Sequence, residues 1–264
     1  NLMMVQKPEW FGISDAGMAT RISFLTVGIW WIGFAQIPFY YLPGKAAIGK
    51  SSENMLTKGY QELRKVWKDM KHNYVLRSYL LAFFVYNMGV QTVLLVATLF
   101  GAQEIKMETG QLITTILIIQ FVALIGAYLF SFVSKKIGNI RTLMIAVCIW
   151  IGACLGTYFF CYTPNDFFVV AGFVGLVMGG IQSLSRSTYS KLLPETDDHA
   201  SYFSFYDVTE KVCIVLGMAT FGIINEMSTN MRKPIIMLIV FFILGFLLLL
   251  RVPKGKMPVS STNA

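Results

Sequence analysis

The stretch Pro234-Ile-Ile-Met-Leu-Ile-Val-Phe-Phe-Ile-Leu-Gly-Phe-Leu-Leu-Leu-Leu250 contains no charged side chain. A helix needs roughly 20 apolar residues to cross a hydrocarbon core about 30 Å thick, so residues 234–251 are predicted to span a membrane. Five further stretches have the same character, at residues 21–42, 76–100, 111–133, 142–162 and 166–186. A seventh, at residues 203–225, is long enough only when its polar residues are included.

The composition of the whole chain agrees with this pattern. Its 264 residues are 55% hydrophobic and 14% charged, with a mean hydropathy of +0.61. Soluble proteins carry about 25% charged residues, so these values exclude a disordered chain, a disulfide-stapled secreted domain and a soluble enzyme. We predict an all-α membrane protein, a polytopic helix bundle. The apolar residues 2–5, which follow Asn1 without a basic segment, indicate the end of an earlier membrane helix rather than a signal peptide. We therefore expect the chain to be a fragment.

The basic residues indicate the orientation of the predicted helices. Most of the 22 Lys and Arg residues lie in the connections at 43–75, 134–141, 186–202 and 251–264. The opposite ends hold only Lys7, Arg21, Lys106, Arg232 and Lys233. Because cytoplasmic loops are enriched in Lys and Arg, the long loop and the C-terminus are predicted to be cytoplasmic, at the inner membrane if the source is bacterial. The net charge of +8 follows from this topology, and no nucleic acid is expected as a partner.

The pattern divides the chain into four segments. One span lies in residues 1–42, a cytoplasmic loop in 43–75, a block of six spans in 76–251 and a cytoplasmic tail in 252–264. Within the loop, apolar residues recur at spacings of three and four, which predicts an amphipathic helix over 56–74 with Leu56, Tyr60, Leu63, Trp67, Met70 and Tyr74 on one face. Two placements remain open: along the membrane interface, or packed on cytoplasmic parts of the same protein.

The sequence lacks the motifs of common enzyme classes. The chain has four Cys without a C-x-x-C pair, and both His lie in predicted loops. It contains no H-E-x-x-H, no phosphate-binding glycine loop and no G-x-S-x-G. We therefore predict no enzymatic activity, no cofactor and no metal site, and expect the function to reside within the helix bundle.

Three charged residues, Asp207, Glu210 and Lys211, lie in the seventh stretch. The apolar run 212–224 is too short to cross a bilayer, so the helix is predicted to carry all three into the membrane. Asp207 and Lys211 are four residues apart and can pair. Charges in membrane helices often mark a transport pathway. The alternative is a neutral pair near the interface, with Lys211 extending to the headgroups.

Uncharged polar residues provide further candidates. Asn87 and Gln91 share a helix face, and Gln182 follows the G-x-x-x-G pair Gly175 and Gly179. The glycines fit either close helix packing or a bending helix that lines a cavity. For Gln120, a hydrogen bond to a neighbouring helix is the favoured role.

Two stretches resemble one branch of the major facilitator superfamily, which includes the autophagy-related vacuolar effluxers of fungi and their bacterial relatives. Residues 179–194, Gly-Gly-Ile-Gln-Ser-Leu-Ser-Arg-Ser-Thr-Tyr-Ser-Lys-Leu-Leu-Pro, resemble its tenth helix and the following loop. Residues 201–211, Ser-Tyr-Phe-Ser-Phe-Tyr-Asp-Val-Thr-Glu-Lys, resemble the start of its eleventh helix. The resemblance implies that residues 1–42 end an N-terminal half with helix six, and that 76–251 form the six-helix C-terminal half. Transporters of this fold bind solutes between the two halves.

The cytoplasmic loop motif of the superfamily is only partly present. Its counterpart is 131–141, Ser-Phe-Val-Ser-Lys-Lys-Ile-Gly-Asn-Ile-Arg, in which Lys136 and Gly138 fit but Ser131 replaces a glycine and Lys135 an acid. The resemblance makes Lys136, Gly138, Arg141 and Arg186 candidate gating and loop residues. It implies a monomeric secondary transporter that moves a small polar solute through the lipid bilayer, amino-acid efflux being the first expectation and protons a possible coupling ion. A carrier for a sugar or a cell-wall fragment, and a non-transporting sensor or scaffold, remain alternatives.

Overall fold

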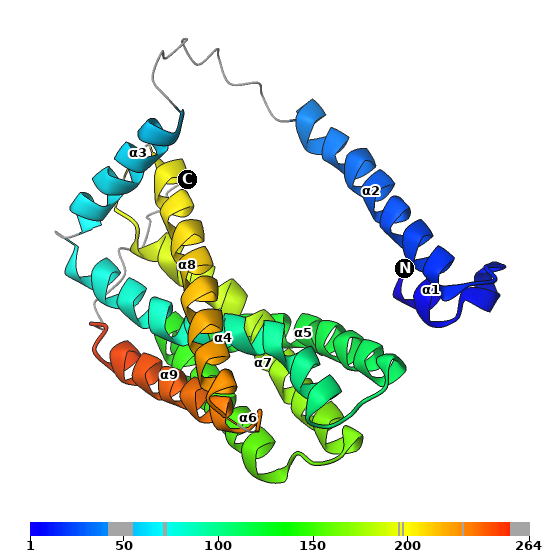
Figure 1. Ribbon diagram of the computed structural model, residues 1–264. Coiled ribbons are helices and arrows are strands. Elements are labelled where there is room, and N and C mark those ends of the chain that lie inside the picture. The colour runs from blue at the N-terminus through cyan, green and yellow to red at the C-terminus, as the bar shows by residue number, and fades with distance from the viewer. Residues whose placement is uncertain (42–54, 71–72, 195, 197, 229, 254–264) are drawn as a thin grey trace. The chain divides into compact units, whose positions relative to one another are not determined.

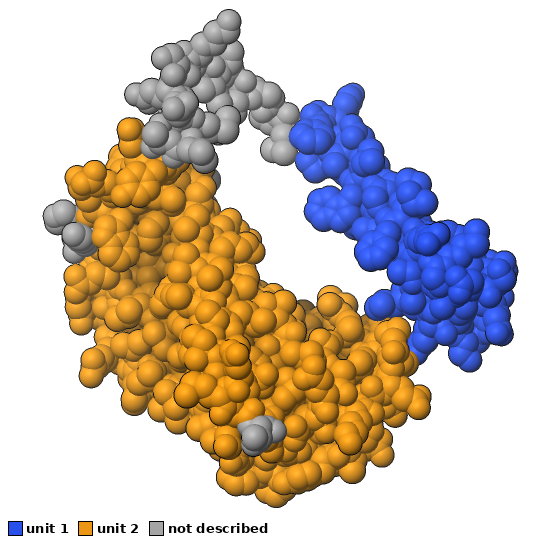
Figure 2. Space-filling view, viewed as in Figure 1, with its two compact units in different colours: residues 1–55 blue, residues 56–264 orange. Residues whose placement is uncertain are grey.

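The computed structural model describes residues 1–41, 55–70, 73–194, 196, 198–228 and 230–253. The described residues form helices and connecting loops without any strand, which confirms the all-α prediction. Residues 254–264 of the predicted tail and residues 43–54 of the predicted loop lie outside these ranges. The chain divides into two compact units, Asn1–Met55 and Leu56–Ala264, coloured separately in Figure 2.

The first unit consists of a short helix, a single 3₁₀ turn and one long helix. Helix α1 (Leu2–Gln6) is followed by η1 (Pro8–Phe11), where Gly12 ends the turn with φ +70°, and by α2 (Ala16–Tyr41). Helix α2 buries only Ala19 and Ser23, and most of its large apolar side chains are exposed. An apolar helix of 26 residues with this surface is suited to a lipid environment.

The second unit begins with α3 (Met55–Met70), which precedes α4 (Tyr74–Gln103). Val66 and Met70 of α3 are buried, whereas Tyr60 and Trp67 are exposed. Of the predicted apolar face, Met70 is buried and Tyr60 and Trp67 are exposed, and Val66, which was not assigned to that face, is buried as well. The predicted end at residue 74 was wrong, because α3 ends at Met70 and Asn73 caps α4 by accepting a hydrogen bond from the Leu76 amide at 3.1 Å. The Trp67 ring lies 6.1 Å from that of Phe205 in α8, so α3 packs on the same unit.

The remaining helices of this unit are α5 (Thr109–Ile137), α6 (Asn139–Phe160), α7 (Pro164–Leu192), α8 (His199–Glu226) and α9 (Lys233–Leu250), shown in Figure 1. Six described helices are long and apolar enough to cross a membrane: α2, α4, α5, α6, α7 and α9. They match the six apolar stretches, and the protein is a multi-pass membrane protein. Helix α8 covers the seventh stretch; its 28 residues exceed the spanning length, but its charges reduce its hydropathy.

Helices α5 and α7 form the most extensive helix–helix contact of the second unit. A Cβ atom added to Gly126 would overlap the carbonyl of Leu176, and one added to Gly179 would overlap that of Ala123. A Cβ at Gly175 would lie 2.8 Å from the carbonyl oxygen of Ile119. The glycines therefore serve close backbone packing, as is common between membrane helices. This packing fixes α7 beside α5, while α4 contacts α7, α8 and α9.

Candidate functional site

Three helices of the second unit enclose a polar cleft. It has a volume of about 260 Å³ and is lined by Phe83, Asn87 and Gln91 of α4, Ile181, Gln182, Ser185 and Arg186 of α7, and Tyr206 and Glu210 of α8. Within each set, residues three or four positions apart share one helix face, as Asn87 and Gln91 do on α4. Of the ten candidates from the sequence, the structure brings together Asn87, Gln91, Gln182, Arg186 and Glu210.

Glu210 occupies the α8 side of the cleft. Its Oε1 accepts a hydrogen bond from Nε2 of Gln91 at 3.2 Å, which links α8 to α4. The same oxygen lies 3.9 Å from Nζ of Lys211, a side chain that is 71% exposed and is not part of the cleft lining. Long, exposed ion pairs contribute little to stability. Glu210 therefore presents a carboxylate to the cleft that is only weakly neutralised.

Arg186 and Asp207 form an ion pair between α7 and α8. Nη2 of Arg186 donates to Oδ1 of Asp207 at 3.1 Å, and the guanidinium lies 5.8 Å from the centre of the Phe203 ring. The predicted pairing of Asp207 with Lys211 is not found, because the Asp207 carboxylate pairs across helices and Lys211 approaches Glu210 instead. Asp207 and Lys211 thus lie beside the cleft rather than in its lining.

We expect the Arg186–Asp207 pair to contribute little to folding. The side chains are 58% and 54% exposed, so an Asp207→Asn variant is expected to lose less than about 1 kcal/mol of unfolding free energy. Thermal unfolding in detergent measures this, with Glu226→Gln at an exposed position of the same helix as control. A much larger loss for Asp207→Asn would contradict the exposed placement.

Two buried tyrosines of α4 hold the α7 wall of the cleft in place. The hydroxyl of Tyr79 donates to the carbonyl of Ser185 at 2.7 Å, and the hydroxyl of Tyr86 is hydrogen-bonded to Oγ of the same serine at 2.7 Å. Both bonds fix the α7 turn that carries Gln182 and Arg186 against α4. Sequence reasoning missed these residues, since nothing in the local pattern distinguishes a bonded tyrosine from one at the bilayer interface.

The loop candidates lie at the junction of α5 and α6. Gly138 has φ +89°, a conformation that favours glycine, and Nζ of Lys136 lies 4.6 Å from the centre of the Phe132 ring. Arg141 is exposed. Asn139, which the sequence analysis did not single out, is buried and donates to Oγ1 of Thr188 at 3.1 Å, and it accepts from Lys191 at 3.3 Å. It joins this junction to the end of α7; the gating roles stay predictions.

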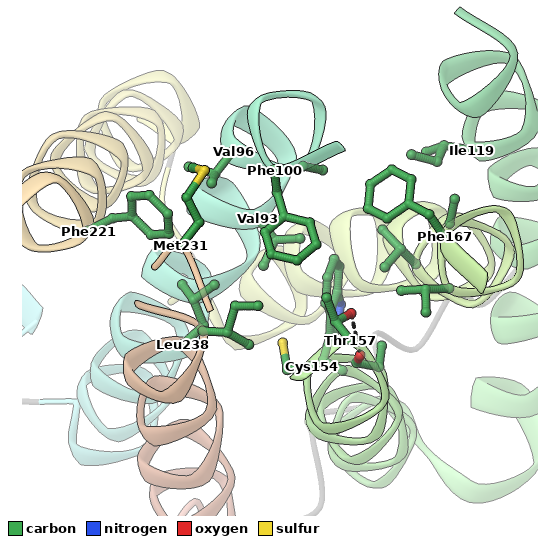
Figure 3. A pocket seen from close by; sticks show the side chains of 17 residues that line it. Val93, Val96, Phe100, Ile119, Cys154, Thr157, Phe167, Phe221, Met231 and Leu238 are labelled. Atoms are coloured by element: carbon green, nitrogen blue, oxygen red, sulfur yellow. Dashed lines mark hydrogen bonds between the residues drawn. The ribbon is translucent and has the colours of Figure 1, made fainter. Parts of the chain in front are cut away.

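A second, apolar cavity lies between the helices that carry Val93, Cys154, Phe167, Phe221 and Leu238 (Figure 3). Its volume is about 60 Å³. Apolar cavities of this size remain dry. It therefore does not suit a polar solute.

Among the described residues no group of three or more His, Cys, Asp or Glu is arranged to hold a metal ion. Cys154, Cys161 and Cys213 are buried free thiols, whereas Cys148 is exposed. Gln120, expected to bond a neighbouring helix, is instead exposed on α5.

Comparison with known proteins gives a family match over nearly the whole chain. The family model described as "Vacuole effluxer Atg22 like" matches residues 2–259. The uncharacterized MFS-type transporter YxiO of Bacillus subtilis is 28% identical over 241 residues, covering 89% of this chain and 54% of the relative. Autophagy-related protein 22 of Eremothecium gossypii is 25% identical, and the match covers 89% of this chain and 50% of the relative. The protein of the same name from Kluyveromyces lactis is 26% identical, with 89% of this chain and 52% of the relative covered. The chain thus spans about half the length of these relatives.

Proposed function

The chain belongs to the Atg22-like vacuole effluxer family, and from this premise we propose that it forms part of a secondary transporter for a small polar solute. Transporters of the major facilitator fold bind solutes near the midplane and work by alternating access. The polar cleft of α4, α7 and α8 is then one wall of the solute site. Membership of a transporter family points away from enzymatic activity.

The cleft is the observation that supports this proposal. Its lining combines a carboxylate, a guanidinium, three amides and a serine hydroxyl on three helices of the bundle. Polar groups are costly in membrane helices, and those that face a cavity commonly mark a solute pathway. An apolar core without function would not need them.

We extend the proposal to amino-acid efflux. A zwitterion carries a cationic and an anionic group. The cleft holds Glu210 and Arg186 on neighbouring helices, and Arg186, although paired with Asp207, keeps 58% of its side chain exposed. Charge-assisted hydrogen bonds are roughly twice as strong as neutral ones, so this pair of charges favours a zwitterion over an uncharged sugar. We also propose that the C-terminus is cytoplasmic, since the basic residues gather in the connections on that side.

Replacing Gln182 by methionine tests the role of the cleft. Methionine has a similar length but no hydrogen-bonding amide, so we expect the transport rate to fall about tenfold or more, equivalent to one lost hydrogen bond of about 1.4 kcal/mol. The measurement is solute counterflow in proteoliposomes of the protein that contains this chain, with a panel of amino acids and sugars.

The matched control is Gln120→Met, which makes the same change at an exposed position of α5 outside the cleft. It is expected to transport at the unchanged rate. Equal rates for Gln182→Met and the unchanged protein, with both correctly folded, would remove the cleft from the pathway.

A further inference from the structure

Helix α3 has two different faces within residues 59–70, the part whose side chains the structure describes. One face packs on the second unit, where Val66 and Met70 are buried and α3 lies beside the first turns of α8 (Figure 1). The other face is exposed and combines aromatic with basic side chains: Tyr60, Arg64, Lys65, Trp67 and Lys68. Because a helix has 3.6 residues per turn, these five form one continuous arc opposite Val66.

The acidic residues of α3 do not lie within this exposed arc. Oε2 of Glu62 is buried, and Asp69, at the edge of the arc, interacts electrostatically with Tyr202 of α8. The three basic residues of the arc have no ion-pair partner among the described residues. The exposed face of α3 therefore presents three cations together, which favours an anionic partner.

The connection from α3 to α4 places this face at the membrane surface. The amide of Asn73 donates to the carbonyl of Met70 at 3.1 Å, so a single backbone turn joins the end of α3 to the start of α4. Helix α4 has 30 residues and is about 45 Å long, which is the thickness of a bilayer with its headgroups. The first turn of α4, with Tyr74 and Arg77 exposed, therefore lies at the level of the headgroups.

Anionic lipid is a partner that suits this face and lies within its reach. Basic residues next to a membrane helix are attracted to anionic headgroups, and Trp and Tyr side chains are enriched at the boundary of the hydrocarbon core. Tyr60 and Trp67 are 67% and 55% exposed. Around the helix they lie between the buried Met70 and the basic Arg64, which is the order that a helix lying along the interface requires.

We propose that the exposed face of α3 binds the headgroups of anionic lipids. Arg64, Lys65 and Lys68 interact with the headgroup phosphates, and Tyr60 and Trp67 enter the boundary with the acyl chains. Helix α3 then packs on the second unit with one face and binds lipid with the other. This inference goes beyond the proposed transport and does not depend on the solute, since none of these residues lines the polar cleft.

The test uses the full protein that contains this chain, in nanodiscs of phosphatidylcholine alone or with about one third phosphatidylglycerol, an anionic lipid. Hydrogen exchange measured by mass spectrometry follows the amides of residues 59–70 separately from those of the other helices. We expect these amides to exchange at least about threefold more slowly with phosphatidylglycerol, and the difference between the lipids to disappear at an ionic strength of about 1 M, where charges are screened beyond about 3 Å.

Three double variants test whether the charge of this face is responsible. Arg64→Gln/Lys68→Gln should exchange at the same rate in both kinds of nanodisc, because half or more of the attraction is removed. Arg64→Lys/Lys68→Arg keeps both charges and should keep the slower exchange. The matched control is Lys106→Gln/Lys233→Gln, which removes two exposed cations near the end of α4 remote from α3 and should also keep it.

Several outcomes would overturn the proposal. Equal exchange of residues 59–70 in both kinds of nanodisc would mean that another part of the protein, or a soluble partner, covers this face. Slower exchange that Arg64→Gln/Lys68→Gln retains, or that the control variant loses, would mean that these cations do not bind the lipid. The comparison of the two lipids and of the two ionic strengths needs no variant, so it decides even if a variant is unstable. Solute counterflow without lipid-dependent exchange would keep the proposed function and overturn this inference alone.

Discussion

Replacing Gly179 by alanine is expected to destabilise the helix bundle by about 3 kcal/mol or more, despite adding only one methyl group. The added Cβ would overlap the backbone carbonyl of Ala123 in α5, and a backbone, unlike a flexible side chain, cannot move without displacing its helix. Gly126→Ala should have a similar effect from the facing side, where the overlap is with Leu176. Thermal unfolding in detergent and the yield of monodisperse protein measure the loss.

Gly172→Ala is the matched control on the same helix. Nothing lies within 4 Å of a Cβ at that position, so alanine should raise stability by about 0.5–1 kcal/mol through its better helix propensity. If Gly179→Ala behaved like Gly172→Ala, the two helices would be further apart than the structure shows. Comparing the two variants also distinguishes close helix packing from helix bending, the two roles that the glycine pattern left open. A glycine that only allows bending, with open space around it, would tolerate the extra methyl group.

Sequence reasoning identified the helices because their signal is local. An apolar run long enough to cross a bilayer is visible without knowledge of its neighbours, and each predicted span lies largely within an observed helix. Asn87 and Gln91 were assigned to one face from their spacing alone. Which neighbouring helix that face contacts depends on tertiary packing. Gln120 also lies within an apolar stretch, yet its side chain is exposed.

The sequence pattern did not predict which side chains pair across helices. Asp207 and Lys211 have ideal spacing for a pair, yet Asp207 bonds Arg186, which lies 21 residues earlier on another helix. Similarly, Val66 of α3 is buried although its neighbour Trp67 fits the apolar repeat better. The periodicity of a sequence shows which residues share a helix face. It does not show which face is buried, because that depends on the element against which the helix packs. The contacts of Arg232 could not be predicted from the sequence either, where this residue only helped to indicate the orientation of the helices.

Replacing Arg232 by methionine is expected to cost about 3–5 kcal/mol of unfolding free energy, since it leaves a buried charge unpaired. Nε of Arg232 donates to Oε1 of Glu104 at 2.9 Å, and the two side chains are only 13% and 21% exposed. Its guanidinium also donates to the carbonyls of Tyr158 at 3.0 Å and Cys161 at 2.5 Å, at the end of α6. The last carbonyls of a helix lack partners within the helix, so this single side chain satisfies carbonyls at the end of α6 and ties them to the side chain of Glu104, which follows α4.

The expected order of the losses in unfolding free energy follows from the groups that each variant leaves unpaired. Arg232→Met strands the Glu104 carboxylate and removes the donors of α6, whereas Glu104→Gln leaves the arginine bound to those carbonyls and should cost less. The double variant should cost less than the sum of the two single changes, because no unpaired charge remains. Lys233→Met removes an adjacent, exposed cation and should stay within about 0.5 kcal/mol of the unchanged protein. Thermal unfolding of the four variants in one detergent gives the comparison. Equal losses of unfolding free energy for Arg232→Met and Lys233→Met would contradict this role of Arg232. They would mean that its bonds to Glu104 and to the carbonyls of α6 stabilise the fold no more than an exposed cation does.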